Sequence, residues 1–404
     1  MTSLNDRLRL PRTSHRRPAT VRRSIVPPYL LERIAGADAF GLERAAAAAR
    51  RSLTADPALR AERGREGESP GLGDAGGGRT TRAAAHPGGW GGPASPGSAA
   101  RLVAGEATES PVPDRTIYDA GETETLPGRV VRREGAPATG DPAADEAYDG
   151  LGATHALLLD AFGRDSIDGK GLPLLASVHY GRDYDNAFWD GDRMVFGDGD
   201  GEVFGRFTAS LSVIGHELAH GVTQYGAGLV YQGQSGALNE SFSDVIGALV
   251  EQHRRGQSAA EADWLIGAGL FTEAVEGRAL RSMLEPGTAY DDDVLGRDPQ
   301  PADMAGYVDT ADDNGGVHLN SGIPNRAFAL AAIELGGRAW ETVGPVWYDT
   351  VGGPLLSATA DFAQFAEATI TTAGERYGSG SREVSAIESA WRSVGVWSDE
   401  RAAR

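Results

Sequence analysis

The residues best suited to chemistry lie in one short run, Gly215-His216-Glu217-Leu218-Ala219-His220-Gly221. His216 and His220 are four residues apart, so on an α-helix both imidazoles project from one face and can bind a single metal ion. Neutral imidazole is a good ligand for Zn²⁺, and the carboxylate of Glu217 lies beside the first ligand, where it can act as a general base. The alternative interpretation is an amphipathic helix that carries two ordinary histidines.

A third ligand must come from another part of the chain, because a catalytic zinc ion has three protein ligands and one open position. A third His six residues after the second is excluded, since Gly226 occupies that position. A helix expected over residues 238–254 offers Glu240, which completes a His₂Glu set. Asn239 and Asp244, on the same helix, could hold the second ring nitrogens of the two histidines. The alternative for Asp244 is a surface carboxylate.

Two stretches, GHELAHGVTQY and GALNESFSD, together resemble the thermolysin (M4) family of zinc metalloendopeptidases. Residues 312–322 resemble the loop with that family's second catalytic histidine, and residues 186–191 with 197–201 resemble its substrate-binding edge strand and turn. The matches follow the family's order over about residues 115 to 400. The resemblance implies an α+β fold with a mainly β N-terminal lobe, a helical C-terminal lobe and the metal-binding helix between them.

The resemblance also implies a mechanism for peptide hydrolysis. Glu217 would take a proton from the attacking water and pass it to the leaving amine. Tyr231 and His318 would donate hydrogen bonds to the oxyanion, and Asp313 would orient the imidazole of His318. The predicted function is that of a zinc-dependent neutral endopeptidase, made as a self-inhibited precursor.

The substrate is expected to lie along an edge strand that contains Asn186 and Ala187, which would bind extended peptide through its main chain. By resemblance, Arg281 binds a substrate carbonyl group, with a structural ion pair as the alternative. Four apolar residues align with the pocket for the residue after the scissile bond: Phe204, Phe207, Val213 and Leu280. We therefore expect cleavage before Leu, Ile, Val or Phe.

The family's double calcium site is largely missing from this sequence. Of its five carboxylates, only Glu251 and Asp263 are present, and the other three positions hold Ser212, Leu265 and Ala268. Two possibilities remain open, one weakly bound Ca²⁺ at this site or Ca²⁺ binding by the loop at residues 291–293.

The N-terminal part of the chain divides into a basic prosegment, residues 1–50, and a Gly/Ala/Arg-rich linker, residues 51–111, whose composition predicts disorder. Residues 24–34 resemble the short prosegment of the family's protealysin-like branch, and Pro27-Pro28 predicts an extended stretch before a short helix. We expect Tyr29 and its neighbours to block the catalytic cleft until they are cut away. The alternative is a disordered basic arm. The catalytic lobes are predicted at residues 112–225 and 226–404.

Composition limits the remaining possibilities. The 404 residues include no cysteine, which excludes disulfides and thiolate metal sites. Residues 1–110 hold 17 Lys and Arg against 11 Asp and Glu, while the whole chain has a net charge of −19. An acidic catalytic part argues against nucleic acid as a partner, and no apolar run is long enough to span a membrane. We expect a monomer that acts on peptides and proteins.

The basic N-terminus lacks the apolar core of a signal peptide. Because the family is largely exported, we expect secretion by a route without a recognisable signal, with the cytoplasm as the alternative.

Hydrophobic periodicity predicts strands of an antiparallel sheet at residues 130–131, 173–179 and 194–196. It predicts helices over 145–162, 208–225, 238–254, 261–274, 325–335, 361–373 and 381–394.

Two other functions remain open on the sequence alone. One is a zinc-dependent binding protein that does not hydrolyse peptides, and the other is an effector-like interaction protein with one target.

Overall fold

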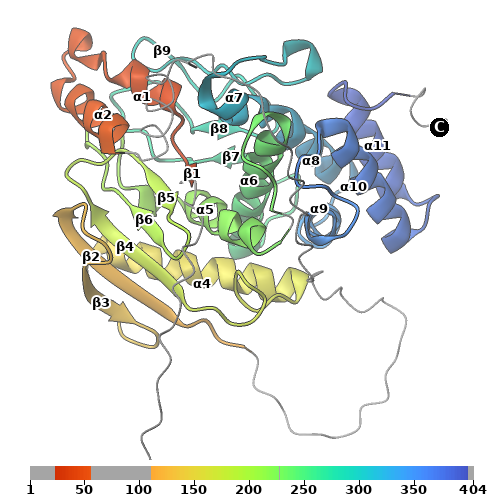
Figure 1. The fold of residues 1–404 in the computed structure, drawn as a ribbon, viewed down its shortest axis with the longest axis horizontal. Coiled ribbons are helices and arrows are strands. Elements are labelled where there is room, and N and C mark those ends of the chain that lie inside the picture. Colours follow the sequence, from red (N-terminus) through yellow and green to blue (C-terminus); the bar gives the residue numbers. More distant parts are fainter. Residues whose placement is uncertain (1–22, 56–110, 227, 399–404) are drawn as a thin grey trace, which may run out of the picture.

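The computed structural model describes residues 23–55, 111–226 and 228–398. They form a β-sheet part that includes helix α4 (Pro142–Phe162), and a mainly helical part that begins after residue 232. Helix α5 (Leu211–Gln224) lies between the two parts, and all its residues from Ser212 to Thr223 are buried (Figure 1). The two-lobed α+β fold with the metal-binding helix between its lobes is therefore confirmed.

The large sheet has six strands in the order β1-β5-β6-β4-β2-β3. They are β1 (Arg23–Ser24), β2 (Arg115–Thr123), β3 (Arg129–Arg133), β4 (Leu174–Tyr180), β5 (Ala187–Trp189) and β6 (Met194–Phe196). The prediction of an antiparallel sheet is wrong for two pairs, because β4 runs parallel to both β2 and β6. Parallel neighbours need a long crossover, and α4 lies in the connection from β3 to β4. The sheet is therefore mixed, and β1 from the N-terminal end of the chain forms its edge.

Helices α5 and α6 (Gly233–Arg255) pack closely because glycines lie where they cross. A Cβ atom added at Gly247 would lie 2.3 Å from the carbonyl oxygen of Ser212, and one added at Gly215 would lie 2.9 Å from the Cα atom of Gly247. No larger residue fits at such distances, so the two glycines allow the two helices to bring their inner faces together.

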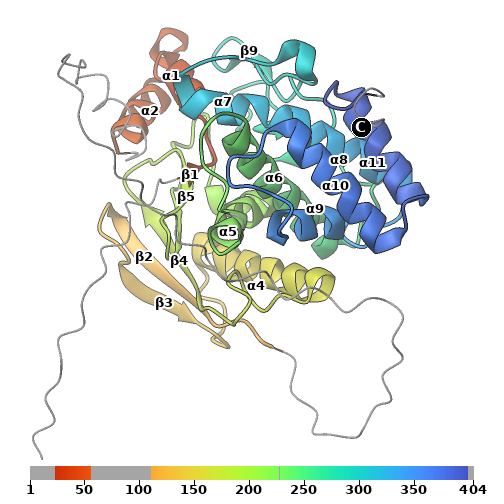
Figure 2. The same ribbon diagram turned by 45° about the vertical axis from the view of Figure 1, so that its right-hand side comes forward.

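The remaining helices build the C-terminal lobe, on the right of Figure 2. They are α7 (Asp312–Asn320), α8 (Gly322–Leu335), α9 (Val343–Gly352), α10 (Phe362–Tyr377) and α11 (Arg382–Ser393). Short strands also pair there, β7 (Leu265–Ile266) with β8 (Arg281–Ser282), and β9 (Asp291–Asp292) with β10 (Gly296–Arg297). No helix in the described ranges is both long enough and apolar enough to cross a membrane.

One predicted helix, over residues 261–274, is wrong, and helix α9 was not predicted. The chain around β7 cannot continue as an α-helix, because Trp264, Gly267 and Gly269 have φ values of 58°, 75° and 78°. Such left-handed residues end a right-handed helix. Helices predicted over 145–162, 208–225, 238–254, 325–335, 361–373 and 381–394 are confirmed, with ends that differ by a few residues.

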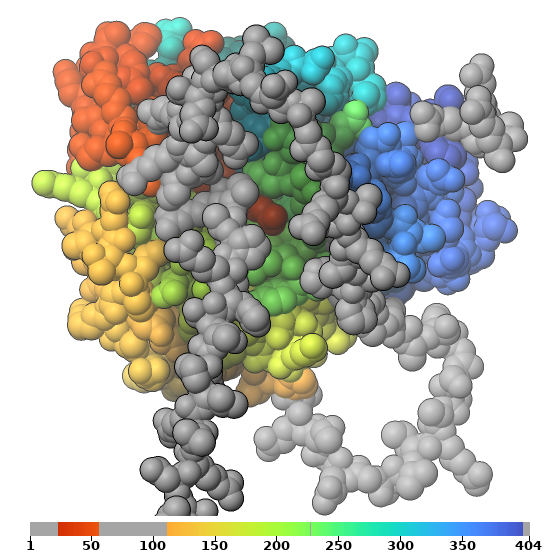
Figure 3. Space-filling view, in the orientation of Figure 1, coloured from red at the N-terminus to blue at the C-terminus, as the bar shows by residue number. Residues whose placement is uncertain are grey.

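The N-terminal segment, which we define as residues 23–55, is folded against the rest of the molecule. After β1, Pro27 is extended as predicted, with φ −64° and ψ 148°, and the predicted short helix α1 (Pro28–Ile34) follows, but it already includes Pro28, which was expected in the extended stretch. Helix α2 (Glu43–Ala55) continues past residue 50, so the predicted end of the prosegment falls inside this helix. The predicted linker from residue 56 to 110 lies outside the described residues. Figure 3 shows the two helices in red against one side of the molecule.

Candidate metal centre and active site

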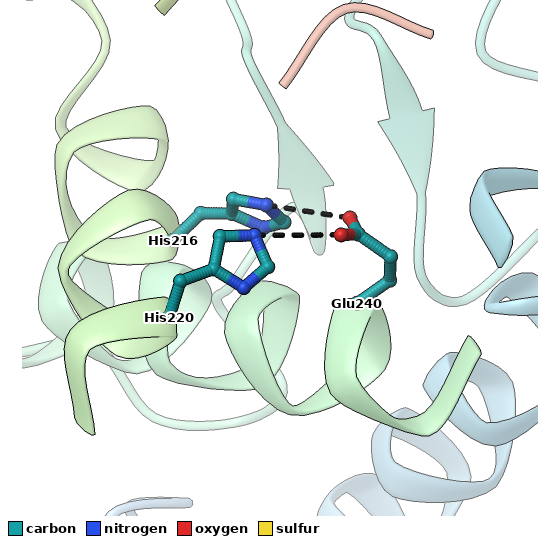
Figure 4. Close-up of side chains that lie close together, drawn as sticks. All are labelled: His216, His220 and Glu240. Carbon is teal, nitrogen blue, oxygen red and sulfur yellow. Dashed lines mark ion pairs between the residues drawn. The ribbon is translucent and has the colours of Figure 1, made fainter. Parts of the chain in front are cut away.

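The three predicted metal ligands converge from two helices. His216 and His220 on α5 are completely buried, and Glu240 on α6 is 1% exposed. The Nε2 atoms of the histidines lie 3.4 Å from Glu240 Oε2 and Oε1, respectively (Figure 4). Ligands about 2.1 Å from a tetrahedral zinc ion are about 3.4 Å apart. Both Nε2 atoms and Glu240 Oε2 are buried without a hydrogen-bond partner, so the residues present fit Zn²⁺.

The other ring nitrogens of the two histidines are held by α6, as the sequence predicts. His216 Nδ1 lies 2.8 Å from Asp244 Oδ1, and His220 Nδ1 lies 3.0 Å from Asn239 Oδ1. Ser243 Oγ, which the sequence analysis missed, lies 3.0 Å from the same nitrogen of His220. When Nδ1 donates to these oxygens, the lone pair of each histidine is on Nε2, which faces Glu240.

Asp244 is a buried charge rather than a surface carboxylate. Arg281 donates two hydrogen bonds to it, at 2.9 and 2.8 Å, and Asn325 donates a third at 2.8 Å. Burial by itself raises the pKa of Asp244, but Arg281 and His216 outweigh it and lower the pKa to about 2. Arg281 therefore makes the structural ion pair that was the alternative interpretation. Its Nη1 atom is not part of this pair and contacts the N-terminal segment. The role of Asn325 had no signal in the sequence.

Glu217 lies beside the metal ligands and is fully buried. Its Oε2 atom accepts a hydrogen bond of 3.0 Å from the backbone N–H of Trp189 on β5, whereas Oε1 has no partner. Burial raises the pKa of Glu217 to about 8. One carboxylate oxygen is therefore fixed by the edge strand, and the other remains free to accept a proton.

A third imidazole, that of His318 on α7, faces the metal ligands. His318 Nε2 lies 3.5 Å from Glu240 Oε2 and 3.4 Å from the hydroxyl oxygen of Tyr231, which donates a hydrogen bond to Glu240. Asp313 accepts from the backbone N–H of His318 at 2.9 Å and lies 2.7 Å from its Nδ1. Burial lowers the pKa of His318, but Asp313 and Glu240 raise it to about 9. Tyr231, His318 and Asp313 thus lie together as predicted.

The backbone of Asp313 explains how its carboxylate reaches the imidazole. Residues Asp313 to Gly316 have left-handed φ angles between 50° and 82° inside α7. The turn brings the Asp313 side chain back over the start of the next helical turn, which carries His318.

The N-terminal segment occupies the edge strand that was predicted to bind substrate. Strand β1 pairs antiparallel with β5, with Ser24 opposite Phe188. Asn186 accepts from the Val26 N–H at 2.9 Å and donates to the Val26 carbonyl oxygen at 3.3 Å. The Ile25 N–H donates to the carbonyl oxygen of Ala187 at 3.1 Å. Two predicted side chains complete these contacts: Arg281 Nη1 lies 3.0 Å from the Ile25 carbonyl oxygen, and His318 Nε2 lies 3.1 Å from that of Ser24.

The residues that contact the predicted active site lie upstream of Pro27-Pro28-Tyr29. Arg23 donates to Thr223 Oγ1 at 3.3 Å, and its guanidinium carbon lies 5.1 Å from the ring centroid of Tyr231. Tyr29 instead contacts the region of Tyr290, and burial raises its pKa well above 10.0. The sequence identified the correct segment, but Arg23 and Thr223 gave no signal before the fold was known.

All four predicted pocket residues are buried in the main hydrophobic core: Phe204, Phe207, Val213 and Leu280. Ile25 and Val26 belong to the same core and are completely buried. The apolar side chains of the N-terminal segment and those of the predicted pocket are therefore all part of the buried core.

Two positions of the family's calcium site make other contacts. Ser212, at the position of a missing carboxylate, accepts a hydrogen bond of 3.1 Å from the backbone N–H of Gly267 on its Oγ atom, and Glu251, one of the two carboxylates present, pairs with Arg255 at 2.7 Å. Among the described residues, only one group of three or more His, Asp or Glu side chains has ligand atoms close enough to share a metal ion, and it is the set His216, His220 and Glu240.

Comparison with known proteins agrees with this geometry. Residues 110–224 match the thermolysin metallopeptidase catalytic domain, and residues 227–396 match the alpha-helical domain of the same peptidases. An extracellular metalloprotease of Pectobacterium carotovorum subsp. carotovorum is 54% identical over 73% of this chain and 83% of its own length. Protease PrtS of Photorhabdus sp. (strain Az29) is 50% identical over 70% of this chain and 76% of its own.

A solved structure is similar over nearly the whole chain. It is the precursor of protealysin, a metalloproteinase from Serratia proteamaculans, with a TM-score of 0.76 and 46% identity over 93% of this chain and 100% of that chain. Both domains of these peptidases are thus present in the chain, and relatives of 50% identity or more match most of their own length. The chain belongs to the thermolysin (M4) family of zinc metalloendopeptidases.

Proposed function

We propose that the chain is the self-inhibited precursor of this endopeptidase, in which the N-terminal segment fills the substrate cleft. The observation that carries the proposal is that Asn186, Ala187, Arg281 and His318 are all engaged by the backbone of residues 24–26. These are the groups that the sequence assigns to substrate. A peptide substrate needs the same contacts, so it cannot bind until the segment leaves. The similarity to a protealysin precursor supports this proposal.

In the active enzyme, His216, His220 and Glu240 hold the zinc ion. When bound, Zn²⁺ would lower the pKa of a water molecule toward about 7 and would polarise the scissile carbonyl group. Glu217 accepts the proton of that water on Oε1, while the Trp189 N–H keeps Oε2 in place. The same carboxyl group then delivers the proton to the leaving amine.

Two side chains stabilise the charge that develops on the carbonyl oxygen. His318 is buried and Tyr231 is half-buried, and the two donors already lie close together before reaction. Donors fixed in advance lower the barrier because they need no reorganisation during the reaction. Asp313 keeps the imidazole of His318 oriented and protonated.

The enzyme recognises the backbone of the substrate and one substrate side chain, that of the residue after the scissile bond. Asn186, Ala187 and Arg281 bind main-chain groups, so they accept any sequence. Specificity comes from the apolar pocket, in which a charged side chain would be buried without a partner. We therefore propose cleavage before Leu, Ile, Val or Phe.

The proposed mature enzyme comprises the lobes at residues 112–225 and 226–404. We extend the proposed prosegment to Ala55, because α2 is continuous to that residue. The relatives named as extracellular support export of the protein, which recovery from the culture medium of the producing cells would test.

Substitution of Glu217 tests the central role in this proposal. Glu217→Gln keeps the shape and an oxygen for the Trp189 N–H, but it cannot accept a proton. Turnover should fall by about 10²–10⁴-fold or more, with zinc content unchanged by metal analysis. Glu388→Gln on α11, where the carboxylate pairs only with Arg392, is the matched control and should leave turnover unchanged. Equal turnover in the two variants would contradict the proposed base.

A further inference from the structure

One peptide bond of the N-terminal segment lies at the place where a scissile bond belongs. The Ser24 carbonyl oxygen lies 3.1 Å from His318 Nε2. The same nitrogen lies 3.5 Å from the ligand Glu240 and 3.4 Å from the Tyr231 hydroxyl. The carbonyl group of Ser24 is therefore next to the donors assigned to the oxyanion and to the metal ligands.

The residues that follow this bond are bound in the register of a leaving peptide. The Ile25 N–H, the leaving nitrogen, donates to Ala187, and the Ile25 carbonyl oxygen accepts from Arg281. Val26 forms both of its backbone hydrogen bonds with Asn186. A shift by one residue would reverse the side chains and break each of these pairs.

The side chain after the bond also suits the proposed pocket. Ile25 is branched, apolar and completely buried, like Phe204, Phe207, Val213 and Leu280. On the other side of the bond, Arg23 is held by its pairing with Trp189 and by Thr223. The residues on both sides of the Ser24–Ile25 bond are thus held in the extended conformation that a bound substrate would have.

We propose that Ser24–Ile25 is the first bond that the enzyme hydrolyses in its own precursor, within a single molecule. This inference rests on the proposed function. The C–N bond breaks, water supplies the hydroxyl group that forms the Ser24 carboxylate, and a proton from water goes to the Ile25 nitrogen. Glu217 carries that proton, because its Oε1 atom has no other partner.

The cut by itself does not open the cleft. Residues 25–55 stay attached through the backbone contacts of Ile25 and Val26 and through α1, whose Leu30, Leu31 and Ile34 are buried. The newly cut chain therefore keeps its substrate-like segment in place. Peptidase activity appears only later, when this segment is released.

The experiment follows zinc-loaded full-length protein over time by intact mass and N-terminal identification, at two concentrations ten-fold apart. The first new chain should begin at Ile25, with the same rate constant at both concentrations. Glu217→Gln protein should stay whole. A first cut elsewhere, with Ser24–Ile25 still intact, would overturn the site, and a rate constant proportional to concentration would overturn cleavage within one molecule.

Two variants and a peptide test the position of the cut, and the peptide does so without any change to the folded protein. Ile25→Leu keeps an apolar side chain and should still be cut directly after Ser24. Ile25→Asp buries a charge and should slow this cut about 100-fold or more. Activated wild-type enzyme should cut a capped peptide of residues 20–31 between Ser24 and Ile25.

These arms separate the two proposals. If the enzyme hydrolyses an unrelated apolar peptide but never the Ser24–Ile25 bond, the inference falls and the proposed function stands. If it hydrolyses neither, the proposed function falls as well.

Discussion

Replacing Asn186 by alanine should loosen the N-terminal segment in the cleft. The Asn186 amide group forms both backbone hydrogen bonds of Val26, at 2.9 and 3.3 Å, and both residues are completely buried. Without the amide, a buried N–H and a buried carbonyl oxygen lose their partners, at about 1–3 kcal/mol each. Even the lower limit, about 2 kcal/mol for the pair, corresponds to roughly 30-fold more frequent opening.

Hydrogen exchange measures this opening directly. The amide hydrogen of Ile25 is the right reporter, because it is bonded to Ala187 and not to Asn186. A Glu217→Gln background prevents cleavage during the experiment. In that background, Asn186→Ala should make the Ile25 amide exchange about 30-fold faster or more.

Asp183→Ala is the control, because Asp183 also binds the N-terminal segment but at the surface. It pairs with Arg44 and Arg51, whose side chains are 58% and 46% exposed. Exposed ion pairs typically contribute about 0.5 kcal/mol each, so loss of both pairs together should speed exchange by only about five-fold. If Asn186→Ala opens the segment no faster than Asp183→Ala does, the buried substrate-like contacts are not what holds it.

Three further predictions concern specificity, pH and calcium. In a peptide series, Leu, Ile, Val or Phe after the scissile bond should be cleaved at least about ten-fold faster than Asp or Lys there, and a preference for charge would refute the apolar pocket. Burial beside Asp200 raises the pKa of Asp185 in the folded protein well above 3.8. The unfolded chain therefore loses this proton at a lower pH than the folded protein does, and the free energy of unfolding falls as pH rises between the two pKa values. Asp185→Asn should remove this fall in thermal stability as pH rises above about 4, and equal pH profiles would contradict it. With zinc held constant, thermal inactivation should be within about two-fold with and without calcium, because three of the five expected carboxylates are replaced; strong protection would argue for a calcium site.

The metal centre could be predicted because its signals are local. The spacing of His216 and His220 fixes both imidazoles on one helical face, whatever the rest of the chain does. Glu240 and Asp244 are one helical turn apart, so the same short stretch supplies a ligand and the partner of a ligand. Resemblance to a known family added His318 and Tyr231, which no spacing rule links to the motif.

Other features depend on tertiary structure and could not be predicted. The apolar pattern over 261–274 is compatible with a helix, but left-handed Trp264, Gly267 and Gly269 turn the chain toward β8 instead. The parallel pairing of β2 with β4 depends on the crossover through α4, and that of β4 with β6 depends on a connection through β5, neither of which periodicity specifies. Among the described residues, the contacts with the cleft come from residues 23–26, where β1 pairs with β5, whereas the sequence drew attention to Tyr29.

The most direct test of this account mixes zinc-loaded full-length protein with an internally quenched apolar peptide and follows hydrolysis and intact mass together. We predict no hydrolysis while the N-terminal segment is in place, and then a rise as chains that have lost residues 25–55 accumulate. Glu217→Gln protein should remain whole and inactive. Full activity from an intact chain would contradict self-inhibition, and zinc-bound protein that never cleaves any peptide would point to a binding protein instead.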